Sequence, residues 1–300
     1  MVARGETVVR ARWRIRRTML VPAQWNGSVE HFYHFFFGYF LPVVLYQERS
    51  GDTSFTLRDC GPMNPWFDLL RPGTDLEFMQ PGVMLHRVVT NRQERVMLRG
   101  WDDPTRFHSA SLRAFATVLS ERAGGPDAAT SSPRVTVLER RTSPTFYTST
   151  SSEVFSSGTD FRSWPNTDEA VDAIQGRGEI QVVDTAAMPP VEQVQLFAAT
   201  EVLLAQHGAG LSNMVFMKPG TTVIEIKPPL ESVISTIYSN LASAMGLGYL
   251  SVEQENEHAP VPASTIRATV DAALSNLGQP VPTMTGSLPM RLLRQLPRRL

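Results

Sequence analysis

The residues best suited to chemistry lie within residues 200–227, where a histidine, two closely spaced glycines and an acidic residue follow one another. His207 is followed by Gly208 and Gly210, which let the backbone turn sharply and approach a ligand without a side-chain clash. The N–H groups at the start of a helix after such a turn favour a negatively charged ligand, phosphate in particular. Glu225 lies further along and can accept hydrogen bonds. This stretch therefore predicts a phosphate-binding turn.

The turn lies between two predicted strands. Residues 202–205 form an apolar run that is long enough for a buried strand, and residues 223–226 form another, with Glu225 near its carboxyl end. Residues 211–217 are predicted to form a short helix between them, which ends before Pro219. Because ligands of open α/β sheets bind at the carboxyl ends of strands, the turn and the acidic residue are placed at a ligand-binding edge.

Two general interpretations of this stretch compete with simple phosphate binding. As a dinucleotide-binding fingerprint it lacks the third glycine, because Asn213 occupies that position, and its helix is shorter than a Rossmann unit needs. As the oxyanion loop of an esterase it has a suitable His-Gly-Ala-Gly sequence, but no G-x-S-x-G nucleophile motif occurs in the chain.

The ordered residues of this stretch resemble the signature of glycosyltransferase family 61. The resemblance rests on residues 207–213, Pro219-Gly220 and residues 223–226, and it covers about residues 130–250 well and the earlier part loosely. It implies an α/β fold of GT-B type, in which two Rossmann-like domains face a cleft and the first domain is small. It also implies an inverting transferase that moves a sugar from a nucleotide-sugar donor to an acceptor hydroxyl on a glycan or glycoprotein.

The same resemblance assigns two arginines to the donor. Residues 134–138 are predicted to form a strand, and Arg140, just past its end, falls on an arginine of the family pattern. A guanidinium group there can bind a diphosphate through two parallel hydrogen bonds, although a surface arginine is the simpler interpretation of this residue alone. Arg162 falls on the arginine of an Arg-x-x-x-Asn motif and is the second candidate.

The candidate catalytic base comes from the first domain. Residues 31–46 are apolar on all sides and are predicted to form a buried core helix, in which His34 falls on a histidine of the family pattern. Gly38 stands where many relatives have an acidic or amide residue, which weakens a base role for the pair. A core histidine bonded to backbone is an equal alternative for His34. His31 and Glu30 are weaker candidates still.

The resemblance thus gives one candidate base, His34, and a set of candidate donor-binding residues. That set comprises Arg140, Arg162, His207, Gly208, Ala209, Gly210, Leu211, Asn213 and Glu225. Glu225 is expected to accept hydrogen bonds from ribose hydroxyls, and His207 either to contact the donor or to hold the turn. No cofactor and no metal site are expected, so metal-independent transfer is predicted.

Composition limits the classes of partner. The net charge is −1, so neither nucleic acid nor an acidic membrane surface is indicated. Cys60 is the single cysteine, which excludes an intrachain disulfide framework and a cysteine-based metal cluster. The most apolar run, residues 31–46, is shorter than the about 20 residues that a spanning helix needs, so no transmembrane segment is predicted. The compartment stays open between a Golgi or endoplasmic reticulum lumen and, for a bacterial chain, the cytoplasm.

Changes in composition divide the chain into five segments. They are a basic segment at 1–17, an acceptor-side α/β domain at 18–123, a linker at 124–133, a nucleotide-sugar-binding α/β domain at 134–250, and a C-terminal helix and tail at 251–300. A Ser/Thr-rich insertion at 142–160 is interpreted as a disordered loop or a lid. Further elements predicted from periodicity are strands at 83–89 and 179–184 and helices that begin at Ser109, Asn166 and Pro189.

Two other classes of function fit the same residues. One is a binding or scaffold protein on this fold with a degenerate site, which would bind a nucleotide sugar without transferring it. The other is a different nucleotide-dependent α/β enzyme, such as a dehydrogenase, which tight binding of a nicotinamide dinucleotide would favour. Fold alone does not decide between them.

Overall fold

The computed structural model describes residues 17–22, 31–70, 73–80, 95–98, 100, 106–125, 132–140, 159–231 and 233–278. Several sequence predictions fall outside these residues. They are the basic segment up to residue 16, the strand at 83–89, residues 126–131 of the linker, most of the Ser/Thr-rich loop and the tail from residue 279.

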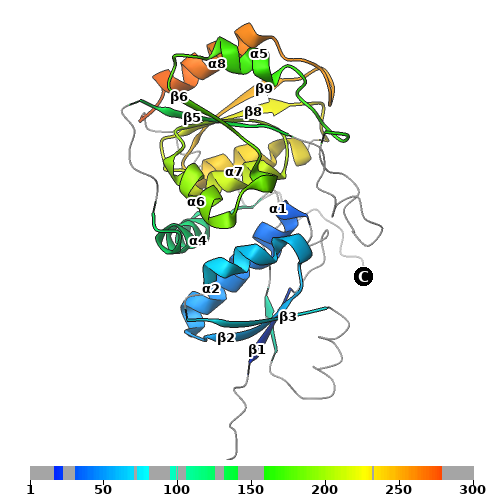
Figure 1. The fold of residues 1–300 in the computed structure, drawn as a ribbon, viewed down its shortest axis with the longest axis vertical. Coiled ribbons are helices and arrows are strands. Elements are labelled where there is room, and N and C mark those ends of the chain that lie inside the picture. Colours follow the sequence, from blue (N-terminus) through cyan, green and yellow to red (C-terminus); the bar gives the residue numbers. More distant parts are fainter. Residues whose placement is uncertain are drawn as a thin grey trace, which may run out of the picture.

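The chain forms two separate parallel sheets (Figure 1). The first has the order β3-β2-β1-β4 and contains β1 (Thr18–Pro22), β2 (Ser54–Arg58), β3 (Asp75–Met79) and β4 (Arg95–Leu98). The second has the order β6-β5-β7-β8-β9 and contains β5 (Arg134–Leu138), β6 (Glu179–Val183), β7 (Val202–Gln206), β8 (Thr222–Lys227) and β9 (Gly248–Glu253). Counted from β5, the second sheet has the order 2-1-3-4-5, which is one of the two common doubly wound arrangements.

Helices cover both faces of the second sheet, as parallel sheets require (Figure 1). One face packs on α5 (Thr167–Ala173) and α8 (Ala263–Ser275). The other packs on α6 (Pro190–Ala199), the 3-10 helix η5 (Ala209–Phe216) and α7 (Ile237–Met245), with the short turns η4 (Thr185–Ala187) and η6 (Ile234–Thr236) in the connections. Because both faces are buried, β7 is apolar along nearly its whole length, and alternate residues belong to the two cores.

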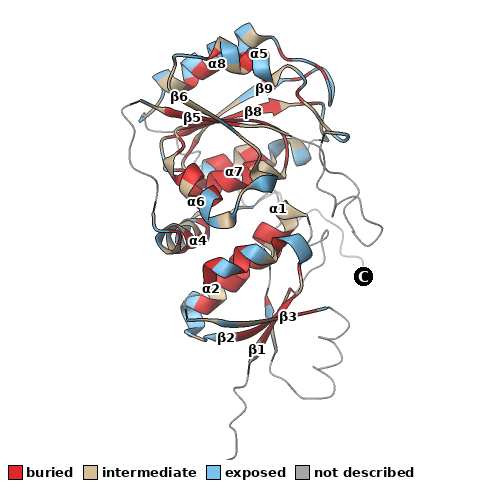
Figure 2. Ribbon diagram, in the orientation of Figure 1, coloured by how far each residue is buried: buried red, intermediate tan, exposed pale blue. Residues whose placement is uncertain are grey.

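One long helical segment follows β1 and lies on the first sheet. It consists of α1 (Phe32–Phe35), a π-helical turn η1 (Phe36–Phe40) and α2 (Leu41–Ser50), and it is followed after β2 by the 3-10 segment η2 (Gly61–Leu70). Figure 2 shows buried residues along α2 and α7 and in both sheets. The sequence prediction of a buried core helix at residues 31–46 is therefore confirmed.

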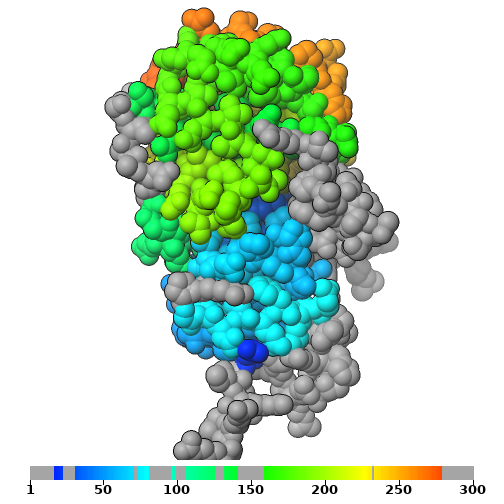
Figure 3. All heavy atoms as spheres, in the orientation of Figure 1, coloured from blue at the N-terminus to red at the C-terminus, as the bar shows by residue number. Residues whose placement is uncertain are grey.

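Aromatic side chains join the two halves into one core. Phe36 of η1 packs edge-on against Phe115 of α4 (Ser109–Arg122) and against Phe216 at the end of η5, with ring centroids 5.2 and 5.8 Å apart. Trp66 of η2 stacks on Phe216 at 6.4 Å. Figure 3 shows the first and second halves in direct contact on the visible face. The α/β class with two parallel sheets is confirmed, whereas the facing cleft of a GT-B enzyme stays a prediction.

Most predicted strands of the second half are confirmed, and the helix starts predicted at Ser109, Asn166 and Pro189 agree with α4, α5 and α6 to within one residue. The short helix predicted after the glycine turn is a 3-10 helix. His108 is the N-cap residue of α4, and its Nδ1 lies 3.1 Å from the Ser111 hydroxyl. Asn166 is the N-cap residue of α5, but its side-chain amide donates to Glu169 and to the Val261 carbonyl and makes no hydrogen bond to the start of the helix.

Helix α8 packs against α5 and on β8 and β9, so it is part of the second half. The sequence division set residues 251–300 apart from that half as a separate segment, because the region after β9 carried no pattern to connect it. Across the described residues, no helix is both long and apolar enough to cross a membrane.

Candidate functional site

The switch point of the second sheet brings Arg140 and His207 together. Strands β5 and β7 are parallel neighbours, with Leu138 paired to Ala205, and their connections leave toward opposite sides of the sheet order. Arg140 and His207 follow directly after the ends of these strands. The Nη2 atom of Arg140 donates to the carbonyl oxygen of His207 at 3.1 Å. Ligands of doubly wound sheets bind at this position, so the two predicted residues lie at the expected place in the fold.

Gly208 is required for space rather than for an unusual backbone conformation. Its φ of 168° is extended and open to any residue. A Cβ atom at this position would lie 1.9 Å from Nη2 of Arg140, so only glycine leaves room for the guanidinium group. A Cβ atom at Gly210 would make contacts of 3.4 Å with Leu138 and 3.5 Å with Thr185, which are near ordinary packing distances. The first glycine of the turn is therefore the one that accommodates the arginine.

A buried carboxylate orients His207. Glu225 is fully buried, and one of its oxygens is hydrogen-bonded to Nδ1 of His207 while the other accepts from the Tyr249 hydroxyl. Because a carboxylate oxygen accepts, Nδ1 carries the hydrogen and Nε2 is the acceptor of the neutral ring. Burial, followed by the charge of Glu225, raises the pKa of Tyr249, which keeps the phenol protonated as a donor.

Tyr238 of α7 closes the other side of the histidine. The rings of His207 and Tyr238 meet edge to face with centroids 5.0 Å apart. Burial, with a smaller effect of Glu225, raises the pKa of Tyr238, so this phenol is also neutral. His207 is thus held by a hydrogen bond and by ring packing, which fixes the imidazole in one orientation.

Two partly buried arginines concentrate positive charge at the switch point. Burial, with a smaller effect of the charge of Arg162, lowers the pKa of Arg140 to about 10. Burial also lowers the pKa of Arg162, which the charge of Glu257 opposes. The Nε atom of Arg162 is buried and has no hydrogen-bond partner among the described residues. A bound anion would relieve the repulsion between the two guanidinium groups and supply a partner for that Nε atom.

Two glutamines fix the loop that carries Arg162. The carbonyl oxygen of Ser163 accepts from Nε2 of Gln206 at 2.9 Å and from Nε2 of Gln254 at 3.0 Å. The two amides also bond to each other at 2.7 Å, and the Ser163 N–H donates to the Glu257 carbonyl. Sequence reasoning missed both glutamines. Gln206 carried a usable signal, since it is a polar residue at the end of an apolar strand and directly precedes His207.

Three other predicted residues lie around the turn without meeting the arginines. Ala209 begins η5 and is partly exposed, whereas Leu211 is buried in the core. The amide of Asn213 donates to Oε1 of Gln193 at 3.1 Å, and Gln193 in turn donates to two carbonyl oxygens before α6. Asn213 thus ties η5 to α6.

The first half contributes the histidines of α1. His34 is half-buried, and its ring lies 5.5 Å from those of His31 and Tyr33. His31 directly precedes α1, and its buried Nδ1 has no hydrogen-bond partner among the described residues. Burial, with smaller effects of the charges of His34 and Arg140, lowers the pKa of His31 to about 4. α1 packs against η5, the helix that follows the His207 turn, so the start of α1 lies on the side of the first half that meets the second sheet.

Gly38 lies in close backbone contact with Gly100, which follows β4. A Cβ atom at Gly100 would lie 2.2 Å from the carbonyl oxygen of Gly38 and 2.4 Å from its Cα. The backbone at Gly100 therefore passes directly over the π-helical turn, and only glycine fits at position 100.

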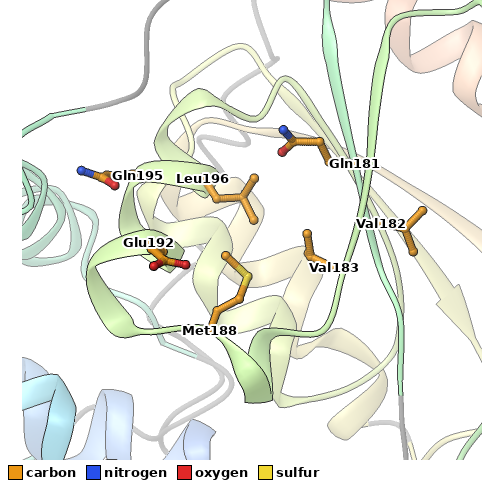
Figure 4. A pocket seen from close by; sticks show the side chains of 7 residues that line it. All are labelled: Gln181, Val182, Val183, Met188, Glu192, Gln195 and Leu196. Carbon is orange, nitrogen blue, oxygen red and sulfur yellow. The ribbon is translucent and has the colours of Figure 1, made fainter.

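A separate hollow lies at the β6 edge of the second sheet. It has a volume of about 390 Å³ and lies between the edge strand β6 and α6 (Figure 4). Its lining residues are Gln181, Val182, Val183, Met188, Glu192, Gln195 and Leu196. No predicted site residue is among them, so this hollow and the arginine site are different places. Within the described ranges, no group of three or more His, Cys, Asp or Glu side chains could hold a metal ion.

A comparison with known protein families gives a match to a family model. The family model described as Glycosyltransferase 61 matches residues 32–224, which is more than half of the chain. The matched span contains α1, Arg140, Arg162 and the His207 turn and ends next to Glu225. A comparison with curated proteins gives no match.

Proposed function

Since the chain belongs to the glycosyltransferase 61 family and is therefore an enzyme that transfers sugars, we propose that it uses a nucleotide-sugar donor and inverts the anomeric carbon. The acceptor is proposed to be a hydroxyl of a glycan or glycoprotein. The single observation that carries the donor assignment is the contact of Arg140 with the His207–Gly208 turn at the switch point of the second sheet.

The donor diphosphate is proposed to bind Arg140 and Arg162 together with the backbone of the glycine turn. The two guanidinium groups repel each other and both are partly desolvated, so a diphosphate would form charge-assisted hydrogen bonds there. Gly208 has no side chain of its own, which leaves room for the guanidinium group of Arg140 against the turn.

In the proposed transfer step, the acceptor oxygen attacks the anomeric carbon from the face opposite the diphosphate. The new carbon–oxygen bond forms while the bond from the anomeric carbon to the phosphate oxygen breaks, and its electron pair stays with the nucleoside diphosphate. Negative charge therefore grows on the leaving phosphate, where Arg140 and Arg162 stabilise it. Because these two cations can stabilise the leaving phosphate without a metal ion, we propose that the transfer is metal-independent.

His207 and Glu225 are proposed to act as one unit. With Nδ1 hydrogen-bonded to Glu225, the neutral imidazole has Nε2 as its available acceptor for a donor hydroxyl. Both oxygens of Glu225 are already hydrogen-bonded inside the protein. This geometry supports a positioning role for Glu225 better than the ribose contact that the sequence suggested.

A binding measurement tests the proposal. Nucleoside diphosphates and nucleotide sugars are screened for stabilisation of the native protein, and a ligand at about 100 times its Kd should add roughly 2.7 kcal/mol. Arg140→Ala should abolish the effect. Arg177→Ala is the matched control, because Arg177 pairs with Asp271 on the far side of the sheet. The donor assignment is wrong if no nucleotide stabilises the native protein, or if Arg140→Ala responds as the native protein does.

A further inference from the structure

An inverting transfer needs a base for the acceptor proton, and the start of α1 places a suitable group beside the arginine site. α1 packs directly against η5, the helix that follows the His207 turn. His31 directly precedes α1 and is partly buried, and its Nδ1 is the buried atom described above, without a hydrogen-bond partner in the described part of the chain. Buried polar atoms are nearly always paired in folded proteins, so an unpaired one calls for a ligand or a function.

We propose that His31 is the general base that removes the proton from the acceptor hydroxyl, and that the donor diphosphate bound at Arg140 activates it. This inference rests on the proposed donor site. As the new bond to the anomeric carbon forms, the acceptor proton passes to the neutral imidazole of His31, and the nucleoside diphosphate leaves with the electron pair of the broken bond. The imidazolium then returns its proton to solvent after the products leave.

The charges around His31 explain the activation. The ring of His34 packs edge-on against that of His31, and Tyr33 packs against His34. Arg140, just past the end of β5, acts on His31 through its charge, and Tyr33 acts in the same way on Tyr238 of α7. Burial, with smaller effects of His34 and Arg140, lowers the pKa of His31 to about 4, so His31 is neutral at pH 7 but a weak base. A diphosphate at Arg140 cancels the positive charge of Arg140 and adds negative charge. The pKa of His31 then rises toward the neutral range in which a general base works best.

His31 suits this role better than His34, the base nominated from sequence. His34 lies one turn further along, where its ring packs edge-on against both Tyr33 and His31. It therefore supports the ring of His31 from the side. We assign His34 as a positioning residue and His31 as the group that meets the acceptor.

The activation is tested by following the histidine signals of the full chain by NMR across pH, with uridine diphosphate, guanosine diphosphate and inorganic pyrophosphate as probes. His31→Gln identifies the signal. A bound diphosphate is expected to raise the pKa of His31 by about one unit or more. In Arg140→Met the pKa should already be raised and should not respond to the probe. An unchanged His31 signal in a native protein that binds the probe would refute the activation.

The base role is tested by turnover, measured as hydrolysis of the nucleotide sugar, in which water replaces the acceptor hydroxyl. His31→Gln should lose roughly 100-fold or more in turnover while its donor Kd stays within about 2-fold of the native value. Added imidazole should restore part of the turnover in His31→Gly. His108→Gln is the matched control, because His108 also directly precedes a helix, with φ of −93° against −89° for His31.

The outcomes separate the two proposals. Native turnover in His31→Gln, with donor binding still dependent on Arg140, overturns the role of His31 and leaves the donor site in place. Donor binding that is unchanged in Arg140→Ala overturns the donor site itself. Should His31→Gln fail to bind the donor, the NMR titration of the native protein still decides the activation.

Discussion

Glu225 and His207 form a hydrogen-bonded pair whose side chains are 0% and 5% exposed, at the point where two neighbouring strands end. The pairing of β7 with β8 brings the two side chains together. Gln206 lies opposite Ile226, so His207, the next residue, is diagonal to Glu225 on the same face of the sheet. Tyr249 reaches the same carboxylate from β9, again diagonally, because Glu225 lies opposite Ser251. The sheet register thus builds a three-residue unit that fixes the ring of His207.

Replacing Glu225 with glutamine should weaken this unit. An amide has one oxygen and one NH2 group, so it cannot accept hydrogen bonds from both His207 and Tyr249 through separate oxygens. At least one buried hydrogen bond is therefore lost or reversed. We expect the free energy of unfolding to fall by about 1–3 kcal/mol. Turnover should fall by roughly 10–100-fold, as for other histidines that a carboxylate orients. Urea denaturation and donor hydrolysis measure the two effects.

Tyr249→Phe is the companion variant for that test. It removes one hydrogen bond to Glu225 and keeps the one to His207. A smaller loss of turnover than in Glu225→Gln, at a comparable loss of stability, is the expected result. Equal losses of turnover in both variants would show that orientation of His207 is not what Glu225 provides.

Gly208→Ala should damage the donor site without damaging the fold. The extended backbone at this position accepts alanine. The new methyl group, however, would lie only 1.9 Å from Nη2 of Arg140, so the guanidinium group would have to move. Loss of charge-assisted hydrogen bonds from the displaced guanidinium should weaken binding of the nucleoside diphosphate by roughly 10–100-fold. Titration calorimetry measures the Kd, and circular dichroism confirms the fold.

Gly210→Ala provides the comparison for that variant. Among the described residues its methyl group would meet Leu138 and Thr185, at 3.4 and 3.5 Å, so the guanidinium group of Arg140 keeps its place. The loss of affinity should be clearly smaller than in Gly208→Ala. A larger loss in Gly210→Ala would mean that contact with the second glycine, rather than room for Arg140, limits donor binding.

The sequence predicts the frame of the site because local patterns determine it. Strands β5, β7 and β8 are buried on both faces, so β7 begins with a continuous apolar run and β5 and β8 are mainly apolar, and the glycine turn marks the ligand edge. The sequence does not determine which type of helix follows the turn, because the apolar residues of η5 fit a 3-10 helix and an α-helix equally well.

The partners of the predicted residues could not be found in the same way. Tyr249 and Gln254 reach the site through sheet register, over separations that no local pattern encodes. His31 was only a weak candidate from sequence, because the packing of α1 on η5 joins segments that lie far apart in the chain. The contact between Gly38 and Gly100 illustrates the same limit, since nothing in either local sequence pairs the two glycines.

Gly100→Ala should therefore destabilise the protein. The new methyl group would lie 2.2 Å from a backbone oxygen of Gly38, and backbone atoms inside a helical turn cannot rotate away as a flexible side chain can. Overpacking of this kind costs about 1–3 kcal/mol. Urea denaturation of Gly100→Ala beside Gly210→Ala measures the difference. Equal stability of the two variants would show that the segment after β4 moves aside at little cost.

The pH dependence of stability should report on His31. In the unfolded chain His31 binds a proton below its ordinary pKa of 6.5, whereas the folded protein binds one only near pH 4. Between these values the unfolded state holds more protons, so stability is lost as the pH falls from about 6.5 to about 4. We expect this group to contribute a loss of about 1–3 kcal/mol, in addition to that from protonation of carboxylates.

His31→Gln removes this contribution, so its free energy of unfolding should gain on that of the native protein as the pH falls from about 7 to about 4. Denaturant titrations at matched ionic strength measure both curves. His108→Gln, whose histidine is hydrogen-bonded to Ser111, serves as the control for loss of a histidine before a helix. Parallel curves for the native protein and His31→Gln would mean that His31 takes up its proton equally well in the folded state. The pKa of His31 would then not be lowered in the folded protein, which would contradict the weak base from which the proposed activation starts.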